Sequence, residues 1–195
     1  MEFQDVVRRR RMVRRFTTEP VAEESLRRIL HNSQRGPSAG FSQGQEFLVL
    51  RGEELPRFWE VAGQRATDPI TTAPLVIVPL SVKDAYLDRY ARPDKGWTDR
   101  DEARWPVPFW HIDTGMAALL ILQTVVDEGL GALYFGIAPD HEAAFKTEFG
   151  VPESHAPIGA IAIGHSDEPQ QEGSSAQRLA RRAATDVVHY GRFTR

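Results

Sequence analysis

The chemically most conspicuous part of the sequence is a run of arginines near its N-terminus. Six of the eight residues from Arg8 to Arg15 are arginine, and the run ends at Phe16. Packing alone does not explain so much positive charge in one place. Because the whole chain has a formal net charge of −3, the run is a local patch and not part of a generally basic surface. We therefore predict a site for a small, specific anion.

A second basic cluster lies close to the C-terminus, at Arg178, Arg181 and Arg182. Guanidinium groups offer paired donors that match a phosphate. A cofactor such as flavin mononucleotide (FMN) combines one phosphate with an electron-poor ring that gains negative charge on reduction, so a cation at each end would suit it. The alternative is that residues 8–15 form a solvated helix face or an arginine–glutamate network. We expect no nucleic-acid binding, since the run contains no aromatic residue for base stacking.

Other catalytic motifs are missing from the sequence or lie in the wrong context. The chain has no cysteine, which excludes disulfides, zinc–thiolate sites and cysteine nucleophiles. Its six histidines include no pair four residues apart and no H-E-x-x-H motif, so we predict no metal site. Residues 36–40 match the G-x-S-x-G nucleophile elbow, but here a helix is predicted before the serine and a strand after it, the reverse of what the elbow needs.

The pattern of apolar residues predicts a single α+β domain over residues 1–195. Helix signals mark residues 5–11, 22–31, 54–61, 113–126 and 139–150, and strand signals mark residues 46–50, 73–80, 132–135 and 158–163. If the first helix continued, Arg10 and Arg14 would share one face. Residues 113–126 are apolar nearly all round, so we expect a helix surrounded by protein. No apolar stretch is long enough to cross a membrane, and we expect a soluble, cytoplasmic protein.

Residues 82–110 differ in composition from the rest of the chain. Aromatic residues alternate there with charges and prolines without a regular period, which is typical of a lid or cap over a site. The rings concerned are those of Tyr86, Tyr90, Trp97, Trp105 and Trp110. They would either sandwich a planar acceptor or pack the seam between two subunits.

Short motifs spread from end to end of the chain resemble those of the FMN-dependent nitroreductase family. The opening residues 10–16 (RRMVRRF) are similar to its R-R-S-x-R-x-F motif, and residues 129–136 (GLGALYFG) are similar to its G-L-G strand. Further matching segments are Pro20-Val21, Pro37-Ser38 with residues 43–47, Asp113 at the start of the family's D-x-G helix, and the closing segments 163–165, 181–182 and 186–189. Such motifs in the same order are far more specific than any one of them.

The resemblance implies a three-layer α+β fold, with a central, mostly antiparallel sheet flanked by helices, in an intertwined homodimer that holds FMN at the subunit interface. It implies an oxidoreductase that carries electrons from NAD(P)H to a nitro, quinone or similar small planar acceptor. The cofactor-binding residues would be Arg10, Arg11, Met12, Arg14, Pro37, Ser38, Ala39, Tyr134, Phe135, Gly136, Arg181 and Arg182, with Pro37 to Ala39 coming from the partner chain. Arg14 would face the flavin N1/O2 edge. Phe41 would join the five aromatic rings of the lid.

The sequence also departs from the family pattern. Met12 replaces the usual serine, and Phe41, Gly44 and Gln45 stand where asparagine, proline and tryptophan are common. An alanine, Ala183 or Ala184, replaces the closing proline. Three alternatives remain open: a non-catalytic flavin-binding or storage protein on the same scaffold, for which the changes at residues 41–45 are the motive; a relative that uses a deazaflavin (F420); and an interaction protein whose arginine helix is merely solvated.

Overall fold

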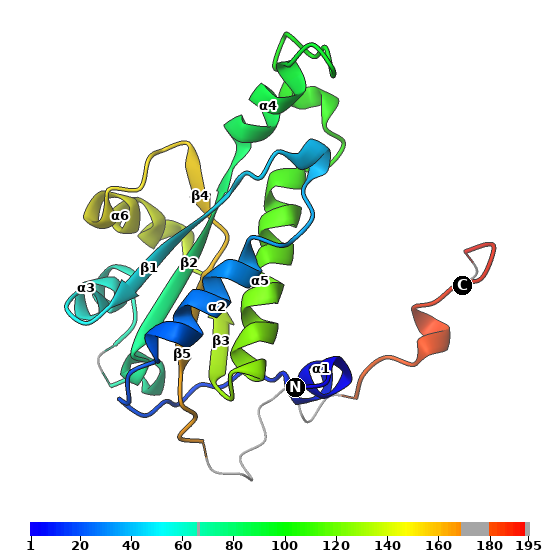
Figure 1. The fold of residues 1–195 in the computed structure, drawn as a ribbon. Coiled ribbons are helices and arrows are strands. Elements are labelled where there is room, and N and C mark those ends of the chain that lie inside the picture. Colours follow the sequence, from blue (N-terminus) through cyan, green and yellow to red (C-terminus); the bar gives the residue numbers. More distant parts are fainter. Residues whose placement is uncertain (66, 169–179, 194–195) are drawn as a thin grey trace.

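The structure, a computed structural model, describes residues 1–65, 67–168 and 180–193. The helices are α1 (Phe3–Arg9), α2 (Glu23–Ser33), α3 (Glu54–Val61), α4 (Lys83–Ala91), α5 (Phe109–Asp127) and α6 (Pro139–Phe149) (Figure 1). The strands are β1 (Gln45–Arg51), β2 (Leu75–Val82), β3 (Gly131–Phe135), β4 (His155–Pro157) and β5 (Ala160–Gly164). This confirms the α+β class expected from the sequence.

The five strands form one antiparallel sheet. Its order is β1-β2-β5-β3, and β4 pairs with the end of β2 beyond β5. The register sets Val49 opposite Ile77 and Ile77 opposite Ile161. All residues of β2 except Val82 are buried, as predicted for residues 73–80, because this strand has neighbours on both sides and helices on both faces.

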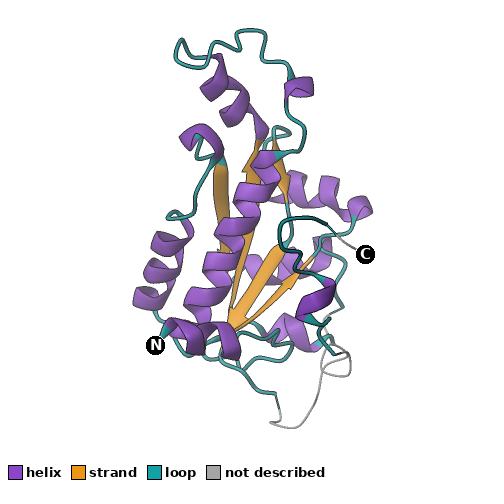
Figure 2. Ribbon diagram, turned by 90° about the vertical axis from the view of Figure 1, so that its right-hand side faces the viewer, coloured by secondary structure: helices purple, strands orange, loops and turns teal. Residues whose placement is uncertain are grey.

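Helices cover both faces of the sheet, which gives three layers (Figure 2). Successive side chains of β2 point to opposite faces: Val76 and Val78 join the cluster that contains Phe58 of α3 and Phe145 of α6. On the other face, Ile77 packs in the cluster of α2 and α5, which includes Ile29 and Ile121.

The long helix α5 differs in one respect from the prediction that protein surrounds it. Within this chain one stripe is open, since Ile112, Met116 and Leu119 are 39%, 40% and 46% exposed. Their spacing of four and three residues places them on one face. The expectation that no apolar stretch is long enough to cross a membrane was wrong: among the described residues, α5 alone has the length and composition to do so, and half of that window is buried within the chain. Because α5 is apolar nearly all round, the sequence alone does not show that one of its faces is exposed in the single chain.

The predicted lid is a separate extension that stands at one end of the sheet, above α5 (Figure 1). Its first part is the regular helix α4, contrary to the prediction of an irregular segment. The helix was missed because its apolar positions do not form a clear stripe. Tyr90, Trp97 and Trp105 pack on one another, with ring centroids 4.6 to 5.6 Å apart.

Two further elements differ from what the sequence predicts. The first helix ends at Arg9, since Arg10 already has an extended ψ of 113°, so Arg10 and Arg14 do not share a helix face. The strand β4 was not predicted at all. It has only three residues, and its pairing with β2 depends on a distant segment of chain rather than on a local pattern.

Candidate functional site

Residues 10–16, the arginine strip, are extended and lie between two other segments. On one side Met12 bridges to Ala132 at the start of β3, and the Val13 N–H donates to the Ala132 carbonyl at 2.9 Å. On the other side Phe16 bridges to Ser166, just after β5. The strip is therefore attached to the sheet by two isolated bridges and is not part of a helix.

Extended backbone points successive side chains in different directions, and the strip separates apolar from cationic ones. Val13 and Phe16 are 3% and 2% exposed and belong to the core. Arg11, Arg14 and Arg15 are exposed, and Arg10 is half-buried. Burial of the two apolar side chains thus decides that the guanidinium groups face outward.

Met12 takes a structural part in this arrangement. Its sulfur lies 3.4 Å from the backbone nitrogen of Tyr134 and accepts its N–H. A thioether is only a weak acceptor and cannot donate. Met12, which stands where the family commonly has serine, thus contacts β3 and has no group that could donate to an anion.

Glu168 contacts two residues of the arginine strip. Sequence reasoning did not identify it. Its carboxylate accepts the Arg14 N–H at 2.5 Å and pairs with the Arg11 guanidinium. Burial alone would raise the pKa of Glu168, but these two donors outweigh burial and hold the pKa below its ordinary value. Nothing near Glu168 in the sequence signals the contact, because its partners lie more than 150 residues away.

The loop that contains Pro37, Ser38 and Ala39 forms a second part of the candidate site. Ser38 closes this loop on itself, since its hydroxyl accepts the Gln43 N–H at 3.0 Å. The Ala39 N–H donates to the carboxylate of Asp113 at 2.8 Å. Pro37 is exposed, and Ser38 and Ala39 are half-buried, so all three have surface to offer to a ligand or a second chain.

The three predicted residues at the end of β3 lie differently from one another. Phe135 packs into the core against Trp59, with the rings 6.0 Å apart and nearly parallel. The hydroxyl of Tyr134 donates to the Ile158 carbonyl, and burial raises its pKa. Gly136 is exposed. The side chains of Tyr134 and Phe135 are thus engaged within the chain, and Gly136 is the exposed residue of this segment.

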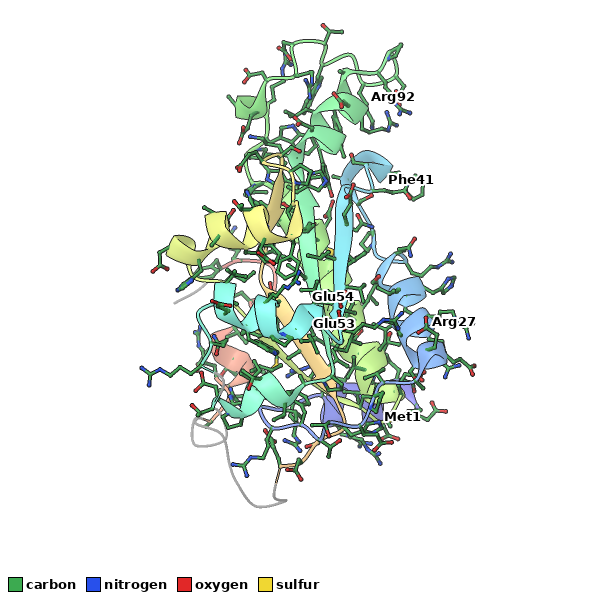
Figure 3. All side chains as sticks on the ribbon, turned by 90° about the vertical axis from the view of Figure 1, so that its left-hand side faces the viewer. Met1, Arg27, Phe41, Glu53, Glu54 and Arg92 are labelled. Atoms are coloured by element: carbon green, nitrogen blue, oxygen red, sulfur yellow. The ribbon has the colours of Figure 1, made fainter. Side chains whose placement is uncertain are left out.

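The predicted lid residues divide into buried and exposed ones. Tyr86 has no exposed surface and Trp110 is 5% exposed, so both belong to the interior of the extension. Tyr90, Trp97 and Trp105 are half-buried. Phe41 is 73% exposed, and Figure 3 shows its side chain pointing away from the body of the molecule.

The second basic cluster lies on the C-terminal segment, residues 180–193, which runs away from the body of the chain (Figure 1). Arg181 and Arg182 are exposed. Arg182 donates to the Asp186 carbonyl at 2.9 Å. Within the described residues, no hydrogen bond or ion pair joins this segment to the arginine strip. Arg178 lies outside the described residues.

No group of three or more histidine, aspartate or glutamate side chains in the described residues could hold a metal ion. Many of the described carboxylates pair with arginine or lysine, as Glu128 does with Arg28 at 2.6 Å.

Comparison with known proteins agrees with this geometry. The family model described as "Nitroreductase family" matches residues 7–165, from the arginine strip to the end of β5. The chain belongs to the nitroreductase family. This is a family of oxidoreductases, and it includes proteins named for the oxidation of NADH or NAD(P)H.

Individual relatives are distant but match over most of their length. The NADH dehydrogenase of Thermus thermophilus is 28% identical over 191 residues, which is 88% of each chain. A protein of Methanothermobacter thermautotrophicus, provisionally assigned as an NADH dehydrogenase/NAD(P)H nitroreductase, is 27% identical and covers 86% of this chain and 79% of its own. A structure from Desulfovibrio desulfuricans, provisionally assigned as a nitroreductase and solved with FMN, has 25% identity and a TM-score of 0.72, with 100% of this chain and 99% of that one covered.

Proposed function

We propose that this nitroreductase-family chain is a cytoplasmic, FMN-dependent oxidoreductase that takes electrons from NAD(P)H and passes them to a nitro, quinone or similar electron-poor acceptor. The single observation that supports this most is the arginine strip. It presents Arg11, Arg14 and Arg15 outward while the apolar Val13 and Phe16 are buried. This separation suits a phosphate ligand, because guanidinium groups bind phosphate bidentately.

The residues of this chain fit FMN in chemical type. Arg10, Arg11 and Arg14 would bind the phosphate and the pyrimidine edge, and a cation near N1/O2 favours the reduced, anionic ring. The segment from Tyr134 to Gly136 would lie against the ring, with the exposed Gly136 nearest to solvent. When bound, FMN would accept hydride from the nicotinamide and return electrons to the acceptor. The protein's part is to bind and orient these molecules.

We further propose that the working form is a homodimer. The uncovered stripe of α5 and the exposed C-terminal segment both carry apolar surface, including Leu119 and Tyr190, which are 46% and 93% exposed. Contiguous apolar surface of this kind marks an interface. In the dimer, Pro37 to Ala39 of one chain would line the cofactor of the other, and Arg181 or Arg182 would complete its phosphate site.

The acceptor would bind beside the half-buried rings of the extension. Tyr90 and Trp97 retain accessible surface, and Phe41 is exposed. Tyr86 and Trp110 are inside the extension, and we assign them to its packing rather than to the acceptor. A planar electron-poor ring is suited to contact with such aromatic faces.

The proposal is tested by the visible absorption spectrum of the purified protein, followed by anaerobic addition of NADH or NADPH. We expect a yellow protein that is bleached by one of the nicotinamides, and a released chromophore with the mass of FMN. A colourless protein that does not bind added FMN would contradict the proposal. A bound flavin that neither nicotinamide nor a reduced deazaflavin reduces would favour storage, and a released chromophore with the mass of F420 would favour the deazaflavin alternative.

A further inference from the structure

Residues 38–44, the loop before β1, have an unusual backbone. Gly40, Phe41 and Gln43 have φ values of 60°, 57° and 52°. For phenylalanine and glutamine this left-handed region costs about 1 kcal/mol or more each. Such a conformation persists only where neighbouring groups hold it. The neighbours in this case belong to the aromatic extension and to α5.

The first of these holding contacts is made by Asp113, in the first half of α5. Its Oδ2 atom accepts two hydrogen bonds, each 2.8 Å long, one from the Ala39 N–H and one from the Tyr86 hydroxyl. Asp113 is 5% exposed and Tyr86 is fully buried. Burial, and then the bond to Asp113, raise the pKa of Tyr86, which keeps its hydroxyl a donor. One oxygen therefore joins α4, α5 and the loop.

A second contact comes from Arg89 on α4. Its Nε donates to the Gly40 carbonyl at 2.8 Å. Its two terminal nitrogens donate to Asp94 at 2.9 and 2.8 Å, which fixes the guanidinium plane. A lysine could not make these contacts together, because it lacks the planar fork of donors.

Close packing is the third contact. A Cβ atom at Gly40 would lie 2.6 Å from Cε2 of Tyr90, and one at Gly44 would lie 2.4 Å from Cε2 of Tyr86. Both glycines thus admit a tyrosine ring of α4 directly onto the loop backbone. The departure from the family pattern at Gly44 is explained by the presence of Tyr86.

We infer that Asp113 is a positioning residue that couples the aromatic extension to loop 38–44, so that the two act as one unit in presenting Phe41 to the acceptor. The inference rests on the proposed function for the identity of the ligand, but the coupling is a property of the chain alone. Figure 3 shows Phe41 and Arg92, from the loop and from the extension, pointing to the same side. A change inside the extension would then alter acceptor binding through the loop.

The deciding experiment compares the wild type with Tyr86→Phe, which removes one hydroxyl and keeps the ring. Hydrogen exchange is followed at the amides of residues 38–44 in the flavin-free protein. We expect exchange at Ala39 and its neighbours to be at least about 5-fold faster, while exchange in β2 and β5 is unchanged. The matched control is Thr124→Val, which removes a hydroxyl from the far end of α5 and leaves the loop amides as in the wild type.

Two further variants separate the hydrogen bond from general stability. Asp113→Asn keeps one oxygen acceptor and is expected to retain most of the protection at Ala39, whereas Asp113→Ala loses it. If Asp113→Ala does not fold, Tyr86→Phe decides alone. Unchanged loop exchange in Tyr86→Phe, or an increase spread evenly over the core strands, would overturn the inference.

A kinetic measurement then tests the consequence for the acceptor. With 2-methyl-1,4-naphthoquinone as the acceptor, Tyr86→Phe is expected to raise KM about 3- to 10-fold and to change kcat less than 2-fold. Equal losses in kcat and kcat/KM would contradict positioning of the acceptor. If the protein binds no flavin, the proposed function fails, and the exchange result still decides whether Asp113 couples the extension to the loop.

Discussion

The direction of Arg14 is set by two side chains that do not touch any proposed ligand. Val13 and Phe16 are buried on either side of the pair Arg14-Arg15, so the arginines are left to face outward. Glu168 fixes the backbone at the same point by accepting the Arg14 N–H. Arg8, by contrast, lies on α1 and pairs with Asp5, with 72% of its side chain exposed. Arginines in one run of sequence thus have different surroundings.

Replacement of one arginine at a time distinguishes these surroundings. We expect Arg14→Gln to weaken FMN binding about 10- to 100-fold, which corresponds to the roughly 1.5–3 kcal/mol of a hydrogen bond to a charged group. Arg8→Gln should leave the affinity within about 2-fold, since an exposed pair contributes little. Fluorescence titration of the apoprotein with FMN measures both. Equal affinities in the two variants would refute the assignment of Arg14.

At the scale of elements, the position of the arginine strip depends on its contact with β3. The strip lies against the first residues of β3 through the Val13 to Ala132 hydrogen bond. Gly131 permits this approach, because a Cβ atom there would lie 2.8 Å from Cγ2 and 3.0 Å from Cβ of Val13. Val13 is β-branched and buried, so it has little freedom to move away.

Gly131→Ala should therefore separate the strip from the sheet. Overpacking of this kind costs about 1–3 kcal/mol, or roughly 2–10 °C in Tm for a chain of this size. FMN affinity should fall as well. The double variant Val13→Ala, Gly131→Ala provides the control, since removal of the valine methyls restores the space. Additive losses in the double variant, measured by thermal unfolding, would show that the clash is not at this contact.

At the scale of the whole molecule, large apolar side chains are exposed on α1, on α5 and on the C-terminal segment. The stripe Ile112, Met116 and Leu119 runs along α5, and Phe3 of α1 is 62% exposed. Phe193 on the C-terminal segment is 72% exposed. An α+β core of this size does not need such surface for itself, so we attribute it to a second copy of the chain.

A charge in the centre of the α5 stripe tests this attribution. Leu119→Glu should convert the dimer into a monomer in analytical ultracentrifugation, because a buried, unpaired carboxylate is strongly unfavourable. The protein should lose bound flavin at the same time if the site needs both chains. Arg27→Glu, on the outer side of α2 (Figure 3), is the matched control and should remain dimeric. A wild-type protein that is monomeric at micromolar concentration would contradict the dimer.

Sequence reasoning was most reliable where the pattern is local. The helix at residues 54–61 has the predicted bounds, and α6 ends at Phe149 and is capped by Gly150, which has the left-handed φ of 63° expected of a helix terminator. The fully buried strand β2 was also predicted. Sequence reasoning was less accurate at the first helix, whose last residue it placed at Arg11 and not at Arg9, and at β4, which it did not predict. At both places contacts with distant segments of chain decide the backbone.

The residues alone determined the α+β class and the lack of cysteine and metal-motif chemistry, and they predicted an anion site at the arginine run, because charge, periodicity and residue type are local properties. Only the tertiary structure decided that Glu168 holds Arg11 and Arg14, and that Asp113 joins Ala39 to Tyr86. These partners lie 27 to 157 residues apart along the chain. Such contacts follow from the way the buried faces of the sheet and helices pack together, and local patterns do not encode that packing.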